Sequence, residues 1–193
     1  MSNQVDVKVL ENNIIQYSLN DTEDIIQLIE KELGSFISEW SPWTANDEYT
    51  FGEQKRLFLE NTEDKNSLLK EKLISLSNFI NAAAQDYSTR NGIDVGFLTP
   101  LTVSKYHVGK TMGYHVDSYG DADPEPTISV VLYLNDNYEG GELHFREFDI
   151  TIKPKPYTLV IFPSKEPYYH SSLPLIAGTK YLMPGFFYRR KND

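Results

Sequence analysis

The chain has 193 residues, of which 40% are hydrophobic, 24% are charged and 13% are aromatic. This length suits one domain with a sizeable core, and the composition excludes wholesale disorder and a small disulfide scaffold. The 28 acidic and 18 basic residues leave a formal net charge of −10, and cysteine is absent. We therefore expect no nucleic-acid partner, because duplex binding needs a basic surface. Thiolate metal ligands and thiol catalysis are excluded as well.

The chain also lacks the signals of membrane insertion and secretion. No apolar run approaches the roughly 18 residues of a membrane span, and residues 1–20 lack the basic start and apolar block of a signal peptide. We expect an intracellular, cytoplasmic protein without a membrane partner. We further expect one domain over residues 1–193, in which residues 1–97 form a cover and residues 98–190 form the core.

The predicted cover begins with a strand and a helix. Residues 5–9 alternate valine with polar residues, the period of a half-buried strand. An apolar stripe at helical spacing runs from Ile25 to Trp40, and Asp21 and Thr22 before it are suited to cap a helix.

A second helix is predicted from Ser67 to Gly92. One face of it is apolar, at Leu69, Leu73, Leu76, Ile80, Ala83 and Tyr87. The stripe lasts under three heptads, so it indicates a face packed on the core and not a coiled coil. Residues 41–66, between the two helices, are predicted to be a long loop or a lid.

The core is predicted to be β-structure from residue 98 onward. Short apolar segments recur every 8 to 12 residues between turn residues. Eight segments are interpreted as strands: LTVSKYHV, GYHVDS, TISVVLYLN, GELHFRE, FDITI, TLVIFP, PYYHSS and KYLMPGFFYRR. Eight strands in two sheets form a jelly roll, or double-stranded β-helix. The expected fold is therefore mainly β, a jelly-roll core with the N-terminal helices packed on one sheet.

The strand around residues 128–134 has two different faces. Alternate positions from Ile128 to Leu134 are all apolar and suit a helix cover, whereas Ser129, Val131 and Tyr133 form a mixed face that suits a lined cavity.

Two histidines are candidate metal ligands. His115 and Asp117 are two residues apart on a predicted strand, so both side chains point to one face and can meet at one ion. A surface pair at a strand end would look the same. His170 lies 53 residues after Asp117, on the seventh predicted strand, which neighbours the second in a jelly roll. A third ligand from there would complete a two-histidine, one-carboxylate triad of the kind that binds Fe(II) and leaves positions open.

The other two histidines serve as controls, and one lysine stands out. His144 lies on a polar strand face, and His107 is opposite Tyr106, of which we expect Tyr106 to face the interior. Lys180 begins the eighth strand among apolar alternate neighbours. If it points inward it needs a fixed anion, such as the distal carboxylate of a dicarboxylate ligand.

With these residues in place, the chain resembles the iron(II)- and 2-oxoglutarate-dependent dioxygenases, and among them the prolyl 4-hydroxylase type. The resemblance covers roughly residues 98–190. It rests on four segments in the family's order and spacing: KYHVGKTMGYHVDS, TISVVLYLNDNYEGGELHF, IKPKPYTLVIFPS and YYHSSLPLIAGTKYLMPGFF.

The resemblance implies a complete site. His115, Asp117 and His170 would bind Fe(II), and Lys180 would hold the distal carboxylate of 2-oxoglutarate, the co-substrate used with O₂. Tyr106 and Tyr133 would line the 2-oxoglutarate pocket, and ascorbate would serve as an accessory reductant. The Gly140-Gly141 pair matches the turn before the fourth core strand. A carboxylate at position 117 favours hydroxylation, because halogenating relatives leave that ligand position open.

The sequence departs from the family pattern near the expected substrate. Met112 replaces a common aromatic residue, Phe186 stands where a tryptophan is common, and Pro184 interrupts the last strand, which indicates an edge or a bulge. The implied substrate is a prolyl residue, another amino-acid residue of a peptide or protein, or a free amino acid. The acidic loop of residues 120–126 is expected to border the mouth of the site.

Three other functions stay open at this point. The chain could be a non-catalytic jelly-roll binding module, although such a module would be expected to lose at least one of the four candidate residues. It could be a cupin-like metal enzyme, a class that draws more histidines to its metal. Nucleic-acid demethylation is disfavoured by the charge of −10.

Overall fold

The computed structural model describes residues 5–20, 24–32, 34–44, 50–61 and 67–189. These ranges contain fifteen strands, two α-helices and one 3-10 helix. The first strands and the first helix are β1 (Val5–Val9), β2 (Ile15–Leu19), α1 (Ile26–Lys31), β3 (Ser41–Thr44) and β4 (Thr50–Arg56), followed by α2 (Leu68–Asn91). The remaining elements are β5 (Phe97–Leu98), β6 (Thr102–Tyr106), β7 (Met112–His115), β8 (Glu125–Tyr133), β9 (Glu139–Gly140), β10 (Leu143–Phe145), η1 (Arg146–Phe148), β11 (Ile150–Ile152), β12 (Thr158–Pro163), β13 (His170–Ser172), β14 (Leu175–Ala177) and β15 (Lys180–Arg189).

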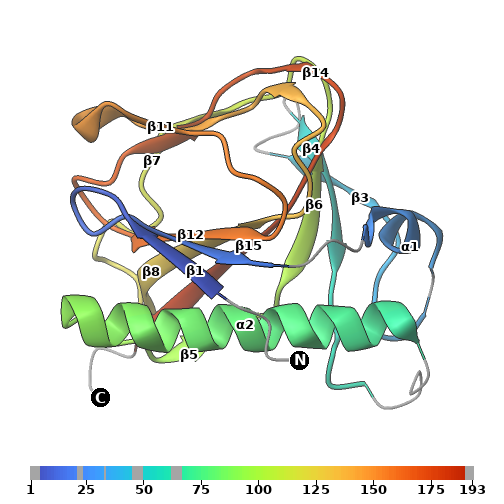
Figure 1. Ribbon diagram of the computed structural model, residues 1–193, viewed down its shortest axis with the longest axis horizontal. Helices are drawn as coiled ribbons and strands as arrows, with labels where there is room; N and C mark the ends of the chain where they lie inside the picture. The colour runs from blue at the N-terminus through green and yellow to red at the C-terminus, as the bar shows by residue number, and fades with distance from the viewer. Residues whose placement is uncertain (1–4, 21–23, 33, 45–49, 62–66, 190–193) are drawn as a thin grey trace.

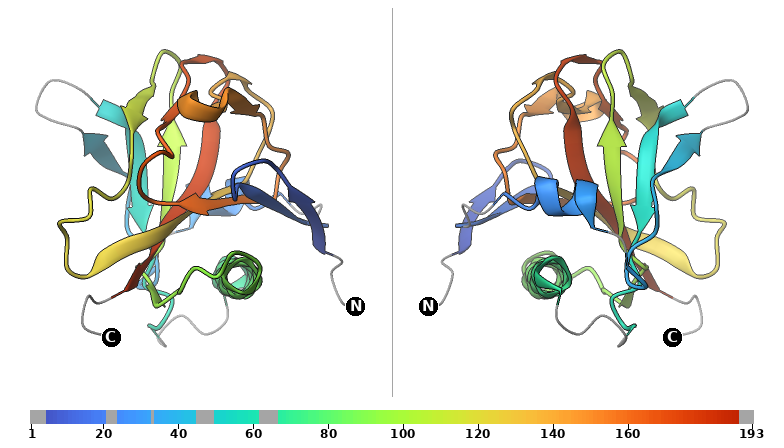
Figure 2. Two further views of the ribbon diagram at one scale, coloured as in Figure 1. Left: turned by 90° about the vertical axis from the view of Figure 1, so that its left-hand side faces the viewer. Right: turned by 90° about the vertical axis from the view of Figure 1, so that its right-hand side faces the viewer.

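Two sheets face each other and form the jelly roll. The larger, nine-stranded sheet has the order β1-β2-β12-β8-β15-β6-β4-β3, with β5 also paired to β15, and the smaller has the order β11-β10-β13-β7. The eight predicted core strands are all present, four in each sheet. Figure 1 shows the two sheets one above the other, and Figure 2 shows α2 end-on beneath the larger one. The predicted jelly-roll core is confirmed.

The larger sheet separates two apolar layers. On β8, Ile128 and Leu132 pack into the cluster that contains the buried face of α2, whereas Tyr133 belongs to the cluster between the sheets. β12 is buried along its whole length and contributes alternate residues to both layers. The two predicted faces of β8 are therefore confirmed, and the inner one is free to line a cavity.

Helix α2 covers the outer face of the larger sheet as predicted. The hydroxyl of Ser67 accepts a hydrogen bond from the backbone N–H of Lys70 (3.1 Å), and Gly92 ends the helix with φ of 63°, a conformation that suits glycine. The six predicted apolar positions are all buried. Neither α-helix within the described ranges combines the length and the apolar character needed to cross a membrane.

Replacing Leu73 in α2 by alanine should destabilise the fold. Leu73 is fully buried in the layer between helix and sheet, and removal of such a side chain costs about 2–5 kcal/mol through lost burial and a residual cavity. Thermal unfolding should show a Tm lower by roughly 5–15 °C. The exposed Ser75 of the same helix provides the control, because Ser75→Ala should leave Tm nearly unchanged. Equal melting of the two variants would contradict this packing.

The first predicted helix is much shorter than expected. Among the described residues between 24 and 44, only 26–31 are α-helical, and the chain then turns through a bridge between Gly34 and Ile37. A buried lysine, Lys55, donates from Nζ to the carbonyl of Ile29 at 2.7 Å. The prediction of a helix to Trp40 was wrong. The carbonyl of Ile29 accepts its hydrogen bond from a side chain of the distant strand β4, where a longer helix would supply a backbone N–H. The proposed caps at Asp21 and Thr22 lie outside the described residues.

Four strands of the larger sheet were not predicted from the sequence: β2, β3, β4 and the two-residue β5. β2 pairs with β1 through a turn in which Asn12 and Asn13 have positive φ values of 58° and 57°. β3 and β4 form a hairpin within the segment predicted to be a loop, and β4 pairs with β6. The long-loop prediction for residues 41–66 was therefore wrong. Whether part of this segment acts as a lid stays a prediction.

Pro184 lies inside β15 at a place where one side of the strand has no sheet neighbour. β15 pairs with β8 on one side along its length, but on the other side with β6 only up to Leu182 and with β5 only from Phe187. Pro184 occupies the interval between these two partners, where no neighbouring strand needs its N–H. The predicted local edge is confirmed.

Candidate metal centre and its cavity

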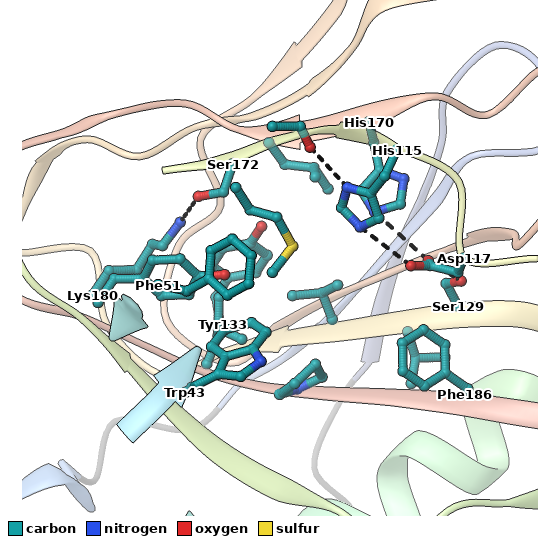
Figure 3. Close-up of a pocket in the computed structure, with 18 of the residues that line it drawn as sticks. Trp43, Phe51, His115, Asp117, Ser129, Tyr133, His170, Ser172, Lys180 and Phe186 are labelled. Carbon is teal, nitrogen blue, oxygen red and sulfur yellow. Dashed lines mark hydrogen bonds and ion pairs between the residues drawn. The ribbon is translucent and has the colours of Figure 1, made fainter. Parts of the chain in front are cut away.

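Two adjacent strands of the smaller sheet bring the candidate ligands together. β7 and β13 are antiparallel, with His115 directly opposite His170, and the two ring centroids are 4.4 Å apart. The backbone N–H of Asp117 donates to the carbonyl of Ser164, just beyond β12, at 2.8 Å. Figure 3 shows the two imidazoles side by side above the Asp117 carboxylate.

The three side chains present a compact set of donor atoms. One ligand atom from each of His115, Asp117 and His170 lies within 4.8 Å of the others. Nε2 of His115 is 3.4 Å from Oδ1 of Asp117, and Nε2 of His170 is 3.6 Å from Oδ2. In the described part of the chain, no other group of three histidine or acidic residues has such spacing. Two imidazoles and one carboxylate are the donor set that suits Fe(II) with open positions.

Backbone carbonyls orient both imidazoles. Nδ1 of His115 donates to the carbonyl of Gly113 at 2.8 Å, and Nδ1 of His170 donates to that of Tyr168 at 3.1 Å. The Nε2 atom of each ring faces Asp117 and is the nitrogen left to bind a metal. This second layer of hydrogen bonds fixes the tautomer that a metal ligand requires.

The carboxylate of Asp117 is held by a pair of serines. Ser129 of β8 donates to Oδ2 at 2.5 Å, and its hydroxyl is 2.9 Å from that of Ser164. Burial alone would raise the pKa of Asp117, but the hydrogen bond with His115 and the charge of His170 outweigh burial and lower the pKa. The residue is therefore a carboxylate at neutral pH, as metal binding needs.

The pKa values of the two histidines shift in opposite directions. Burial lowers the pKa of His170 below its ordinary value, and the charge of Asp117 opposes this only in part. Burial acts in the same direction on His115, but its hydrogen bonds with Asp117 and Gly113 outweigh burial and raise the pKa. The most deeply placed imidazole, His170, is thus neutral at pH 7 and available as a ligand.

Lys180 lies at the other end of the same inner face. It is 1% exposed, and its Nζ donates to the carbonyl of Gly141 (2.9 Å) and to the hydroxyl of Ser172. The same atom lies 4.4 Å from the ring centroid of Tyr106. Burial lowers the pKa of Lys180 to about 7, and the charge of Glu142 offsets this only slightly. None of the three contacting groups is an anion, so this ammonium suits an anionic ligand.

The Gly140-Gly141 turn leaves room for the side chain of Lys180. Both residues have positive φ, 71° and 67°, and a Cβ on Gly141 would lie 3.4 Å from Nζ of Lys180. At Gly140 a Cβ would approach the carbonyl oxygen of Pro174 to 2.4 Å. Larger residues would strain the turn and crowd the ammonium.

The three candidate metal ligands and the lysine line one cavity of about 580 Å³ between the sheets. Tyr106 and Tyr133 also line this cavity, and both are buried. Met112 and Phe186, the two departures from the family pattern, also line it. They are therefore placed to contact a substrate.

Sequence reasoning missed several residues of the cavity. Trp43 and Phe51 line it from the β3–β4 hairpin, with ring centroids 5.1 Å apart. No local signal in the sequence places that hairpin beside β6. Ser172, which binds Lys180, follows His170 by two residues on the same strand face, so strand alternation would have found it.

The control residues lie away from the cavity lining. His107 is exposed and pairs with Glu53 at 2.9 Å, and His144 bonds to the hydroxyl of Tyr114. Residues 120–126 are not among those that line the cavity. Their position at its mouth stays a prediction.

Sequence comparisons agree with this geometry. Residues 101–188 match the family model of the 2OG-Fe(II) oxygenase superfamily. A PKHD-type hydroxylase of Shewanella baltica (strain OS155 / ATCC BAA-1091) is 28% identical over 120 residues, which cover 58% of this chain and 48% of that protein. A PKHD-type hydroxylase of Xanthomonas campestris pv. campestris (strain B100) is 36% identical over 93 residues, covering 42% and 40%. The chain thus spans about half or less of the length of these relatives.

Solved structures share the fold. The viral collagen prolyl hydroxylase vCPH from Paramecium Bursaria Chlorella virus-1, in its 2OG complex, has a TM-score of 0.57 at 21% identity, over 72% of this chain and 80% of that chain. A Pseudomonas putida prolyl-4-hydroxylase has a TM-score of 0.54 at 21% identity, over 72% of each chain. Both support the double-stranded β-helix fold. Residues 101–188 therefore combine a match to the 2OG-Fe(II) oxygenase superfamily, named for Fe(II) and 2-oxoglutarate, with the fold of these solved hydroxylases.

Proposed function

We propose that the chain is an Fe(II)- and 2-oxoglutarate-dependent hydroxylase in which His115, Asp117 and His170 bind the metal. Lys180 holds the distal carboxylate of 2-oxoglutarate, and Tyr106 and Tyr133 line its pocket. One observation supports this most strongly: a single cavity has three convergent metal donors at one end and a buried ammonium without an anionic contact at the other.

The residues of the chain supply binding and orientation. With the bound metal, O₂ and 2-oxoglutarate insert one oxygen atom into a substrate C–H bond while the other converts 2-oxoglutarate to succinate and CO₂. Ser129 holds the Asp117 carboxylate in place, and the carbonyls of Gly113 and Tyr168 keep the proton on Nδ1 of the histidines. The apolar lining from Leu143 and Leu182 excludes water from the reacting groups.

The proposed substrate is a prolyl or other amino-acid residue of a peptide or protein. The names of the relatives, PKHD-type hydroxylase, and of the structural neighbours, collagen prolyl hydroxylase and prolyl-4-hydroxylase, support an amino-acid residue as the target. Met112 and Phe186 alter the part of the cavity expected to contact it. Ascorbate is proposed only as an accessory reductant. The proposed location is intracellular, and the absence of cysteine is consistent with such a reducing compartment.

Two of the alternative hypotheses, the binding module and the cupin-like enzyme, are less consistent with the site. A non-catalytic binding module has no need for a complete donor set together with a buried lysine. A cupin-like enzyme would bring a further histidine to the metal, yet His107 and His144 bond elsewhere, to Glu53 and Tyr114.

An anaerobic titration tests the proposal. Fe(II) and 2-oxoglutarate are added to metal-free protein, and the weak visible charge-transfer band of a chelated iron–keto-acid complex is followed. The band should appear in the wild type and in His107→Ala, which alters an exposed histidine outside the cavity. On admission of O₂, succinate should form. A well-folded protein that gives neither the band nor succinate would contradict the proposal.

A further inference from the structure

A second, smaller pocket lies across strand β15 from the metal ligands. It has a volume of about 250 Å³, and Trp43, Pro184 and Phe186 line both this pocket and the main cavity. Phe186 pairs with Ser129 of β8, the serine that binds Asp117, whereas the small pocket is lined from β6 and β4 on the other side of β15. The three shared side chains therefore separate two hollows on one face of the sheet.

The small pocket contains a buried hydroxyl group without a partner. Ser104 is 1% exposed, and among the described residues its Oγ has no hydrogen-bond partner. Gln54 lies directly opposite Ser104 in the pairing of β4 with β6, and its carboxamide can both donate and accept. A buried hydroxyl left unpaired destabilises the folded protein, so a ligand that supplies a partner recovers that loss.

The lining of the small pocket is uncharged. None of its residues is ionised at neutral pH. The charged neighbours Glu53 and Lys105 pair with each other at 3.1 Å, and neither lines the pocket. Apolar walls from Trp43, Pro184 and Phe186 around a polar floor suit a neutral hydrogen-bonding group such as an amide.

The distance from the metal end of the main cavity, marked by Ser129, to Gln54 in the small pocket exceeds the length of one amino acid. From Ser129 on β8 to Gln54 on β4 the sheet crosses three strand spacings, which is about 14 Å at about 4.8 Å each. An extended peptide covers that distance with about four residues at roughly 3.3 Å per residue.

We infer that the small pocket is a second substrate subsite, which binds an uncharged amide or hydroxyl group of an extended peptide through Ser104 and Gln54. The target residue of the same peptide then lies in the main cavity, on the other side of Trp43, Pro184 and Phe186. This inference rests on the proposed function and deepens it: the substrate is an extended peptide segment that is recognised beyond its target residue.

Peptide-stimulated turnover tests the inference without a known substrate. A random-sequence dodecapeptide library is compared with the same library hydrolysed to free amino acids, and succinate formation is measured. The intact library should stimulate the wild type and the hydrolysate should not. In Ser104→Ala and in Gln54→Leu the library concentration for half-maximal stimulation should rise about three- to tenfold, the effect of one lost hydrogen bond. Ser75→Ala, on the exposed face of α2, should behave as the wild type.

Thermal unfolding distinguishes a binding role from a structural one. Ser104→Ala removes an unpaired buried hydroxyl, so its Tm should equal or exceed that of the wild type. A lower Tm would assign Ser104 to packing and overturn the inference, as would equal stimulation by library and hydrolysate or unchanged stimulation in both variants. The anaerobic iron–2-oxoglutarate band, recorded for each protein, reports the proposed function separately, and its absence from the wild type would overturn both.

Discussion

Replacement of His170 by alanine should lower the affinity for Fe(II) at least about 100-fold, because loss of a direct ligand exceeds the 10- to 100-fold effect of losing a supporting hydrogen bond. His170 is the most deeply placed of the three donors, and it packs against Phe145 and Phe162 with ring centroids 5.8 and 4.7 Å away. No other histidine of the described chain is placed to replace it. Anaerobic titration of Fe(II) against a competing chelator measures the affinity directly, and succinate formation should fall with it.

Two further variants separate ligation from packing. His170→Gln keeps most of the side-chain volume between the phenylalanines, so it should fold as the wild type and still lose the metal. His144→Ala changes a histidine on the adjacent strand β10, whose partner is Tyr114, and should bind Fe(II) normally. Retention of metal affinity by both His170 variants would remove this residue from the proposed triad.

Replacement of Lys180 by methionine should weaken 2-oxoglutarate binding at least about 100-fold and raise the stability of the protein without ligand. The first effect follows because the ligand carboxylate would lose its only proposed cation inside a buried cavity. The second follows because the wild type buries an ammonium whose contacts are a carbonyl, a hydroxyl and an aromatic ring. Dependence of the charge-transfer band on 2-oxoglutarate gives the affinity, and Tm should rise by about 3 °C or more.

The stabilisation should depend on pH. Burial lowers the pKa of Lys180 from 10.5 to about 7. Below pH 7 the folded wild type carries the full penalty of the buried charge. Between pH 7 and about 10.5 the unfolded chain binds one proton more than the folded chain at this site, so wild-type stability rises with pH. The advantage of Lys180→Met should therefore be largest below pH 7 and fade toward pH 10.

Lys105 provides the matched control for Lys180. It lies on the neighbouring strand β6 and is only 12% exposed, but it pairs with Glu30 at 3.3 Å and Glu53 at 3.1 Å. Lys105→Met should leave 2-oxoglutarate affinity unchanged and should not raise Tm, because it leaves two carboxylates without their partner. A rise in Tm for Lys105→Met similar to that for Lys180→Met would show that the stabilisation does not depend on the missing anionic contact of Lys180.

The core could be predicted because its signals are local. Alternation along each strand identified the eight core segments, and the known neighbour relation of the second and seventh strands closed the 53-residue gap between Asp117 and His170. Tyr106 was correctly chosen over His107 on the same basis, since strand neighbours point to opposite faces.

The cover could not be predicted in the same way, because distant contacts decide it. Helix α1 ends early where Lys55 binds the carbonyl of Ile29, 26 residues earlier in the chain. Trp43 reaches the cavity only because β3 pairs with β4 and Gly52 of β4 pairs with Tyr106 of β6. Neither contact leaves a periodic signal within a short stretch of sequence.

The division of the site between the two sheets has a mechanical consequence. His115 and His170 belong to the smaller sheet, whereas Lys180, Tyr106 and Tyr133 belong to the larger one. A ligand bound at both ends would contact both sheets and stabilise their packing against each other. Loading of the site should thus slow amide hydrogen exchange in both sheets together, including in β11 and β2, strands that contribute no residue to the cavity lining.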